Sequence, residues 1–424
     1  MRSKPSLWLT LALLPALAAP VLGQPRPVGD EFRVNANTAN KQRNPVAAYT
    51  ASGSVLVVWE NDRAGLRGRL YGHDGSPQSG ELSLVANQTL PRIPAQGLEV
   101  IRKEPAVAAL SSGGFLLAWT EERDNVSADL FLETRTPLDR NIYVQKLSPA
   151  GVPQGSPLRL NATVTGFQSN PKILVRNGAD ALVAWQSDDR TASRLGDGVF
   201  ARTVRTSSNL QTTSGELKLS STPGFAANVS LAPAGNGGFA AAWEAADADS
   251  QGVYVRLFDR SASPRGAEFR VNTTVAGLQR RAAITADPNT GGFLVVWQGQ
   301  AGTIKDSHIY GQFLSAGGSF VGPQFRVSQG VAQGQIAPSV AGVNGHFLVV
   351  WADYADIFPV GVFGVEIDKL GNALGDEVEI NSAPINAVTR TAIALSPLGD
   401  VLVPWEGFTT DRDAPGIAAR RVDF

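Results

Sequence analysis

The chain has 424 residues, with 37 Lys and Arg against 38 Asp and Glu, and it contains no cysteine. Without cysteine, disulfides, thiol catalysis and a lipid anchor on an N-terminal cysteine are excluded. The formal net charge of −1 gives no overall field that would attract nucleic acid or an acidic membrane, so we expect neither as a partner and expect any ligand to meet a local patch.

The first 23 residues have the pattern of an export signal. Arg2 and Lys4 precede an apolar stretch, Leu7 to Leu22, and small residues mark a cleavage site before Gln24. A membrane anchor is the alternative, but prolines interrupt this stretch and it is shorter than the roughly 20 residues of a spanning helix. We therefore predict a signal peptide over residues 1–23 and a secreted protein that is extracellular, at the cell surface or periplasmic. No later segment is apolar for long enough to span a bilayer.

At the start of the mature chain, Glu31 to Asn35 have the pattern of an outer strand that lacks a sheet of its own. At the other end, Gly416 to Phe424 have the pattern of a third strand that lacks a fourth. We expect these two ends to pair, because the pairing would complete the last sheet and remove an exposed edge.

Residues 24–424 are predicted to form a single repeating domain. Seven of the eight tryptophans close similar apolar runs at intervals of 54 to 66 residues, a period that suits four short strands and their turns. They are Trp59, Trp119, Trp185, Trp243, Trp297, Trp351 and Trp405. The predicted fold is all-β, a seven-bladed β-propeller of four-stranded blades, with its ring closed by the N-terminal strand in the C-terminal blade.

The repeat is clearest over residues 281–328. Small side chains at 282–286 predict a strand crowded against others around the axis. The wholly apolar run at 293–297 predicts a strand covered on both faces. The alternating runs at 308–313 and 324–328 predict two outer strands nearer to solvent.

The motif Gly-Gly-Phe-x-Val-Val-Trp, followed by Ile-Tyr-Gly-Gln-x-Phe and then by Phe-Arg-Val-Asn or a close variant, resembles a β-propeller-like repeat of bacterial secreted and cell-surface proteins, some of them large adhesin-like chains. The resemblance covers the whole mature sequence. It is weaker before Trp185 and Trp243, where Ala-Asp-Ala-Leu and Ala-Ala-Ala replace the usual residues. It implies the repeat architecture, and it brings no catalytic residues and no agreed ligand.

In each repeat, the loop after the strand that ends in tryptophan (the tryptophan strand) and the loop that leads to the first strand of the next repeat should emerge on one face of the domain. The longest such segments are 86–104 and 120–141, which we expect to be neighbouring loops and a recognition patch. Neutral drift in loop length is an equally good explanation.

Basic residues stand where the first strands are expected to begin, around the mouth of a central channel. The candidate ligand-binding residues are Lys41, Arg43, Arg102, Lys103, Arg280, Arg281 and Arg390. Arginine binds carboxylate, sulfate or phosphate with two parallel hydrogen bonds, so an anionic glycan is the candidate ligand. Solvated side chains, or ion pairs with neighbouring acids, are the alternative that we favour for most of them.

Asp247 and Asp249 begin an oxygen-rich loop that resembles the start of a calcium site. Gln251 stands where an Asp or Asn is expected, and Phe258 where a bidentate Glu is needed. Turn formation explains these aspartates equally well. Calcium at Asp247 and Asp249 is therefore a candidate, and no other cofactor is expected.

Motifs of catalytic chemistry are missing from the sequence. The three histidines lie in different repeats without metal-ligand spacing, and there is no nucleophile elbow, phosphate loop or zinc motif. Sialidases are propellers with an arginine cluster, but their aspartate box is absent here. Glutamates close behind four tryptophans are expected to support the blades rather than catalysis, because repetition favours a structural role. They are Glu60, Glu121, Glu244 and Glu406.

We therefore expect a secreted, monomeric, non-catalytic propeller that serves as a binding or adhesion scaffold for an extracellular anionic glycan or a protein. The alternative is a glycan-processing hydrolase or lyase, sialidase-like, with its site on the loop-rich face.

Overall fold

The computed structural model describes residues 24–423 except 90–95, 129–132, 165, 177–179, 189–196, 208, 222–223, 248–249, 275, 331–333, 344, 356–357, 383–389 and 408–414. The predicted signal peptide, 1–23, lies outside the described residues. In the described part the fold is all-β, as expected, and helical structure is limited to two 3-10 turns, η1 (Gly235–Gly237) and η2 (Ile304–Asp306). No helix there is long and apolar enough to cross a membrane.

Each of the seven repeated tryptophans lies on a strand. These strands are β3 (Val55–Asn61), β8 (Phe115–Ala128), β12 (Asp180–Asp188), β17 (Phe239–Ala246), β21 (Phe293–Gln300), β25 (His346–Ala355) and β29 (Val401–Gly407). Each pairs antiparallel with the first strand before it, from the set β2 (Gln42–Tyr49), β7 (Gln96–Ala109), β11 (Phe167–Arg176), β16 (Ala226–Pro233), β20 (Leu278–Ala286), β24 (Gln335–Val343) and β28 (Ala394–Leu395).

On its other side each tryptophan strand pairs antiparallel with a third strand. The third strands are β4 (Gly65–Tyr71), β9 (Glu133–Leu147), β13 (Gly198–Arg205), β18 (Gln251–Phe258), β22 (Ser307–Leu314), β26 (Phe358–Ile367) and β30 (Gly416–Asp423). The outer strands are β5 (Leu82–Val85), β10 (Pro153–Arg159), β14 (Gln211–Thr212), β15 (Leu217–Lys218), β19 (Phe269–Arg270), β23 (Phe320–Arg326), β27 (Val378–Glu379) and the N-terminal β1 (Arg26–Arg33), and the short β6 (Gln88–Thr89) pairs with β7.

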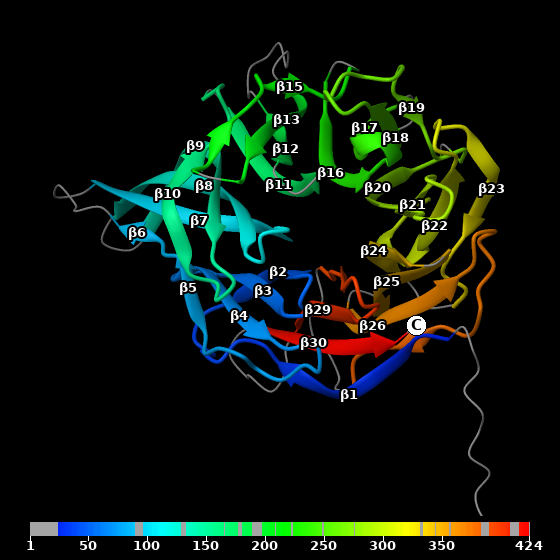
Figure 1. Ribbon diagram of the computed structural model, residues 1–424, viewed down its shortest axis with the longest axis horizontal. Coiled ribbons are helices and arrows are strands. Elements are labelled where there is room, and N and C mark those ends of the chain that lie inside the picture. The colour runs from blue at the N-terminus through cyan, green and yellow to red at the C-terminus, as the bar shows by residue number, and fades with distance from the viewer. Residues whose placement is uncertain are drawn as a thin grey trace, which may run out of the picture.

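The described strands form five open sheets rather than seven separate ones. Two are larger because a parallel bridge joins neighbours, Phe167 to Arg140 between β11 and β9 and Gln251 to Leu278 between β18 and β20. Figure 1 shows the sheets arranged around a common centre, with first strands such as β2, β16 and β24 facing it. The strand at the N-terminus, β1, pairs antiparallel with β30 at the C-terminus, as the sequence predicts.

The core lies between neighbouring repeats. All seven repeated tryptophans are at most 1% exposed and pack against residues of the preceding repeat or, for Trp59, of the last one. Trp59, for example, packs in one cluster with Leu402 and Ile417 of the C-terminal sheet. Burying so much aromatic surface in each interface is the main stabilising term available to a chain without disulfides.

Six first strands contain a β-bulge whose central residue has a left-handed backbone. These residues are Asn44, Glu104, Asn170, Asn228, Arg281 and Ala337, with φ between 50° and 54°. Left-handed φ is uncommon outside glycine, with Asn among the residues that tolerate it best. The bulge bends the strand and takes one amide N–H out of its own ladder, which leaves that amide available to the neighbouring sheet.

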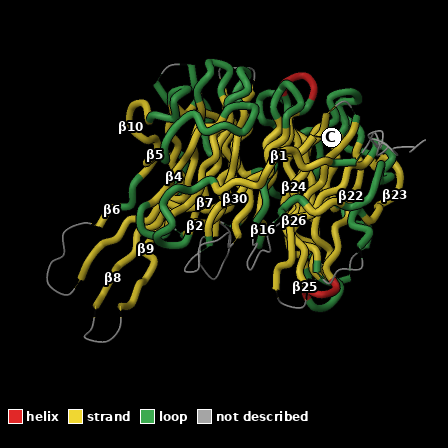
Figure 2. Tube along the Cα trace, turned by 90° about the horizontal axis from the view of Figure 1, so that it is seen from below, coloured by secondary structure: helices red, strands yellow, loops and turns green. Residues whose placement is uncertain are grey.

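The two segments expected to be neighbouring loops do lie side by side, but most of their described residues form strands, so the expectation of loops is wrong. Residues 96–103 and 120–127 pair in register, and 121–128 continue the pairing with 133–141, which extends β7, β8 and β9 into a three-stranded ribbon. Figure 2 shows this ribbon projecting beyond the other sheets. Cross-strand ion pairs such as Arg123 with Asp139 line it. Because these side chains are polar and lie away from the core, the sequence of the ribbon lacks the alternation of apolar and polar residues that predicts a strand.

Candidate functional site

Two adjoining cavities lie where the first strands meet. One has a volume of about 230 Å³ and is lined by residues of β2, β7, β11, β16, β20, β24 and the segment 390–393. The second has a volume of about 340 Å³ and shares several of these residues with the first, among them Lys172, Ser230 and Arg390. A concave site with a few converging polar groups is the usual form of a ligand site.

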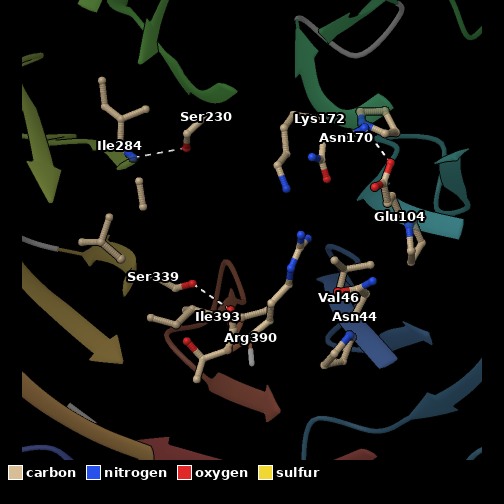
Figure 3. A pocket seen from close by; sticks show the side chains of 17 residues that line it. Asn44, Val46, Glu104, Asn170, Lys172, Ser230, Ile284, Ser339, Arg390 and Ile393 are labelled. Atoms are coloured by element: carbon tan, nitrogen blue, oxygen red, sulfur yellow. Dashed lines mark hydrogen bonds between the residues drawn. The ribbon is translucent and has the colours of Figure 1, made fainter. Parts of the chain in front are cut away.

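Lys172 and Arg390 reach into this cavity from opposite walls (Figure 3). Lys172 stands two residues after the bulge residue of β11, and its half-buried side chain carries the amine into the cavity (Figure 3). The pKa of Lys172 is lowered to about 8, chiefly by burial and then by the positive charge of Arg390, while the negative charge of Glu104 opposes both. A substantial fraction of Lys172 is therefore neutral at mildly alkaline pH, so the amine can accept a proton.

Glu104 supplies the negative charge of the cavity. Among the described residues that line either cavity, it is the one carboxylate. Its Oε2 accepts hydrogen bonds from the hydroxyl of Thr120 at 2.7 Å and from the backbone N–H of Asn170 at 2.9 Å. The walls of the two cavities thus carry three basic side chains, Lys172, Arg281 and Arg390, and one acidic side chain, Glu104.

Carboxylates that follow the tryptophans support the bulges. Glu60 accepts a hydrogen bond from the side-chain amide of Asn44 at 2.7 Å and another from the backbone N–H of Glu104. Glu244 does the same for Asn228, at 3.0 Å, and for the N–H of Arg281. These glutamates link successive first strands, as expected for repeated residues.

Burial raises the pKa of Glu60 to about 7, against the hydrogen bonds from the Glu104 amide and Asn44. It also raises the pKa of Glu244. Glu406 accepts a hydrogen bond from the backbone N–H of Asn44 at 3.4 Å. Glu121 lies on the projecting ribbon and pairs with Arg102 instead.

Two of the seven basic residues predicted at the channel mouth line the cavities. Arg390 borders both, and Arg281 borders the second. Burial, aided by the charges of Arg280 and Arg390, lowers the pKa of Arg281, so these cations are close enough to repel one another.

The other predicted basic residues lie elsewhere. Arg102 is 8% exposed and pairs with Glu121 at 3.1 Å, and Lys103 pairs with Glu122 at 2.7 Å. Arg43 lies 3.8 Å from Asp62, Arg280 donates to Gln300 at 2.7 Å, and Lys41 is exposed. None of these five borders the cavities described above.

Lys172 and Glu104 were not among the predicted site residues. The signal was present, because Asn44-Pro45-Val46, Glu104-Pro105-Ala106 and Asn170-Pro171-Lys172 are equivalent segments. Among the six bulged strands, Lys172 stands where the others carry Val, Ala or Ser, and Glu104 is the one acid where the others carry Asn, Arg or Ala.

The calcium candidate stays a prediction. Asp249 lies outside the described residues. Asp247 accepts a hydrogen bond from the N–H of Ser250 at 2.8 Å and lies 3.7 Å from the guanidinium of Arg270, so its carboxylate already has protein partners. The described part of the chain holds no group of three or more His, Cys, Asp or Glu side chains arranged to bind a metal.

The chain matches no protein-family model and no curated protein. Its fold is similar to that of an ulvan lyase from a new family of polysaccharide lyases, with a TM-score of 0.58 and 11% identity over 92% of this chain and 95% of that one. The same kind of lyase bound to -[GlcA(1-4)Rha3S]- gives a TM-score of 0.53 and 11% identity over the same shares of the two chains.

Two further structures are similar in fold. A protein of unknown function from Dyadobacter fermentans has a TM-score of 0.51 and 11% identity over 94% of this chain and 99% of its own. The NanB sialidase from Streptococcus pneumoniae has a TM-score of 0.50 and 9% identity over 78% of this chain and 68% of its own. At these identities the likeness concerns the fold.

The expectation of a non-catalytic scaffold is corrected by these neighbours. A polysaccharide lyase and a sialidase share the fold, which favours the alternative left open by the sequence, a glycan-processing enzyme. Repeated propeller-like motifs identify a framework, but they do not identify the few non-repeated residues on which chemistry depends.

Proposed function

We propose that the protein is a secreted glycan-processing enzyme that cleaves an acidic polysaccharide as a lyase, with its site in the central cavity. The observation that carries this proposal is the pair Lys172 and Arg390, which face one another across the cavity (Figure 3). One side chain is an amine that can take a proton, and the other is a guanidinium suited to bind a carboxylate.

The charge of the cavity favours a lyase over a hydrolase. Glycoside hydrolases use two carboxyl groups that flank the scissile bond. Glu104 is the only carboxylate among the described lining residues, and it is engaged with Thr120 and Asn170. An elimination on a uronic acid needs a base and a cation that offsets the substrate carboxylate, and both are present.

The proposed chemistry is a β-elimination. The guanidinium of Arg390 binds the uronate carboxylate, which makes the proton on C5 more acidic. Neutral Lys172 takes that proton, the electron pair forms the C4–C5 double bond, and the C4–O glycosidic bond breaks. The Lys172 ammonium then returns the proton to the leaving oxygen, so the products are an unsaturated uronate and a new hydroxyl end.

The structural neighbours support an anionic substrate. The ulvan lyase was solved with a ligand of alternating glucuronate and sulfated rhamnose. The cavity of the present chain carries Lys172, Arg281 and Arg390, and an anionic sugar would offset their mutual repulsion.

We further propose that the sheets form a closed, seven-bladed propeller. A glutamate directly before an outer strand reaches the loop of the preceding repeat at several junctions, for example Glu268, which accepts from the N–H of Ser221 at 2.7 Å, and Glu216, which accepts from the N–H of Ala162 at 2.6 Å. Glu31 of β1 makes the same contact with the N–H of Ser382 at 2.8 Å. The N-terminal strand therefore takes the place of a fourth strand in the last blade.

The test is incubation with glucuronate-containing polysaccharides and with neutral ones of similar length. We expect new ultraviolet absorbance from the unsaturated uronate with the acidic substrates alone. Lys172→Met should lower kcat by about 100-fold or more, as loss of a general base does. Arg390→Gln should raise KM and also lower kcat, because the guanidinium both binds the carboxylate and makes the C5 proton more acidic. The matched control is Arg43→Gln, because Arg43 pairs with Asp62 away from the cavity. New reducing ends without absorbance would mean hydrolysis and would overturn the lyase assignment.

The predicted export signal supports the same proposal, because acidic polysaccharides of this kind are met outside the cell. Expression of the full chain with its first 23 residues should yield a mature protein beginning at Gln24 in the periplasm or medium, checked by N-terminal sequencing.

A further inference from the structure

The junction between β7 and β11 departs from the pattern of four other junctions. At these four the acceptor for the bulge N–H is the residue directly after a tryptophan, namely Glu406 for Asn44, Glu60 for Glu104, Gln186 for Asn228 and Glu244 for Arg281. At the β7–β11 junction the residue after Trp119 is Thr120, whose side chain is short.

Glu104 fills this role instead. Its own carboxylate accepts the N–H of Asn170, the bulge residue of β11, at 2.9 Å, while Thr120 donates its hydroxyl to the same oxygen at 2.7 Å. At this junction the accepting carboxylate therefore belongs to a bulge residue and not to the tryptophan strand. In this position it lies in the wall of the cavity (Figure 3).

Lys172 stands two residues after the amide that Glu104 holds. The β11 bulge, between Ser169 and Lys172 in the pairing with β12, sets the direction in which the lysine leaves the strand. We infer that Glu104 is the positioning residue of this site, which fixes the bulge that carries Lys172 and supplies the negative charge that faces it. The inference deepens the proposed function and rests on the role assigned there to Lys172.

The charges around Lys172 determine in which direction its titration would shift if Glu104 lost its charge. Arg390 faces Lys172 from the segment before β28, Arg281 borders the adjoining cavity from β20, and Glu104 faces it from β7. The cations disfavour a charged lysine, and the carboxylate favours one. Without the Glu104 charge, cations alone would remain, and Lys172 would lose its proton at lower pH.

Glu104→Gln is the discriminating variant, because Gln keeps an oxygen that can accept from Asn170 and Thr120. The titration of Lys172 is followed in the unliganded protein by its rate of reaction with an amine reagent across pH, read by peptide mass spectrometry. We expect the midpoint to fall by on the order of one pH unit. The acid limb of the kcat/KM profile on a glucuronate-containing polysaccharide should move in the same direction.

Two further variants serve as controls. Glu121→Gln removes a carboxylate that pairs with Arg102 on the ribbon, so both midpoints should stay at the wild-type value. Thr120→Val keeps the charge of Glu104 but removes one of its two hydrogen bonds, so kcat should fall while the midpoint stays. If Glu104→Gln does not fold, an unchanged kcat in Thr120→Val would overturn the positioning role.

The outcomes separate this inference from the proposed function. An unchanged Lys172 midpoint in a folded Glu104→Gln variant overturns the inference. A shifted midpoint in a protein that cleaves none of the acidic polysaccharides supports the role of Glu104 and overturns only the proposed lyase activity.

Discussion

Glu31, in the first strand of the chain, accepts hydrogen bonds from the N–H and the hydroxyl of Ser382, at 2.8 Å and 3.1 Å, across 351 residues of sequence. With the pairing of β1 and β30, this contact ties the N-terminus into the C-terminal part of the fold. A contact of such long range is formed late and contributes to the cooperativity of the whole structure.

Removal of residues 31–35 should therefore lower the melting temperature sharply and promote association. The deletion uncovers the edge of β30, and an open strand edge invites pairing with another chain. Thermal unfolding and size-exclusion chromatography measure the two effects. Glu31→Gln is the matched control and should cost only about 1 kcal/mol, since it keeps the strand and an acceptor. A deletion variant that melts like the wild type and stays monomeric would argue against closure of the ring.

The activity of the proposed lyase should rise with pH through about 8. Lys172 must be neutral to take a proton, and its pKa is lowered to about 8, so the fraction of competent enzyme grows as pH increases through that value. The profile of kcat/KM against pH reports this acid limb. Activity that declines through the same interval would be incompatible with an amine base.

Lys172 should also affect stability in alkaline solution. Its pKa falls from 10.5 to about 8 on folding, so between these values the unfolded chain binds more protons than the folded one. Stability from this group therefore increases with pH through that window. Lys172→Met should flatten this part of the curve, as measured by denaturant unfolding at several pH values.

Glu60 should affect stability with the opposite sign. Burial raises its pKa from 4.5 to about 7, so the folded protein holds the extra proton between these values. The contribution is complete below pH 4.5 and is lost as pH rises through about 7. Glu60→Gln should remove this dependence, which amounts to roughly 3 kcal/mol at most, since a tenfold change in proton affinity corresponds to about 1.4 kcal/mol. Equal slopes for wild type and variant would contradict it.

The tryptophans should differ in what their indole N–H contributes. Trp59 donates to Gln42 at 2.8 Å, whereas the indole nitrogen of Trp243 has no hydrogen-bond partner among the described residues. Trp59→Phe should therefore destabilise by about 1 kcal/mol more than Trp243→Phe, because it also leaves a buried amide oxygen without its donor. Paired urea titrations give the difference, and an equal loss in both variants would show that the hydrogen bond adds nothing net.

Local sequence patterns predicted the framework because the same pattern recurs in each repeat. Apolar runs that end in Trp297 or Trp351 are buried on both faces, and the N-terminal strand could be paired with the C-terminal one because each lacked a partner of its own. The ribbon formed by β7, β8 and β9 escaped prediction because its distal part leaves the core, so its strands carry polar side chains without an apolar period.

The site could be predicted only in part. Arg281 and Arg390, predicted from their position at the start of a first strand, border the cavities, but Arg102 and Lys103 have the same position and instead pair with Glu121 and Glu122. The difference depends on cross-strand register within the ribbon, which sequence spacing does not encode. Lys172 was missed because a bulge, rather than simple alternation, decides which side chain meets the axis.

The left-handed kinks near the axis also bear on how such a cavity can change over evolutionary time. At Asn44, Asn170 and Arg281 the backbone amide, not the side chain two residues later, makes the link to the adjacent module. Val46, Lys172 and Ala283 therefore share one geometric slot while differing in chemistry. New specificities can arise in that slot by single exchanges, and the surrounding architecture need not be rebuilt.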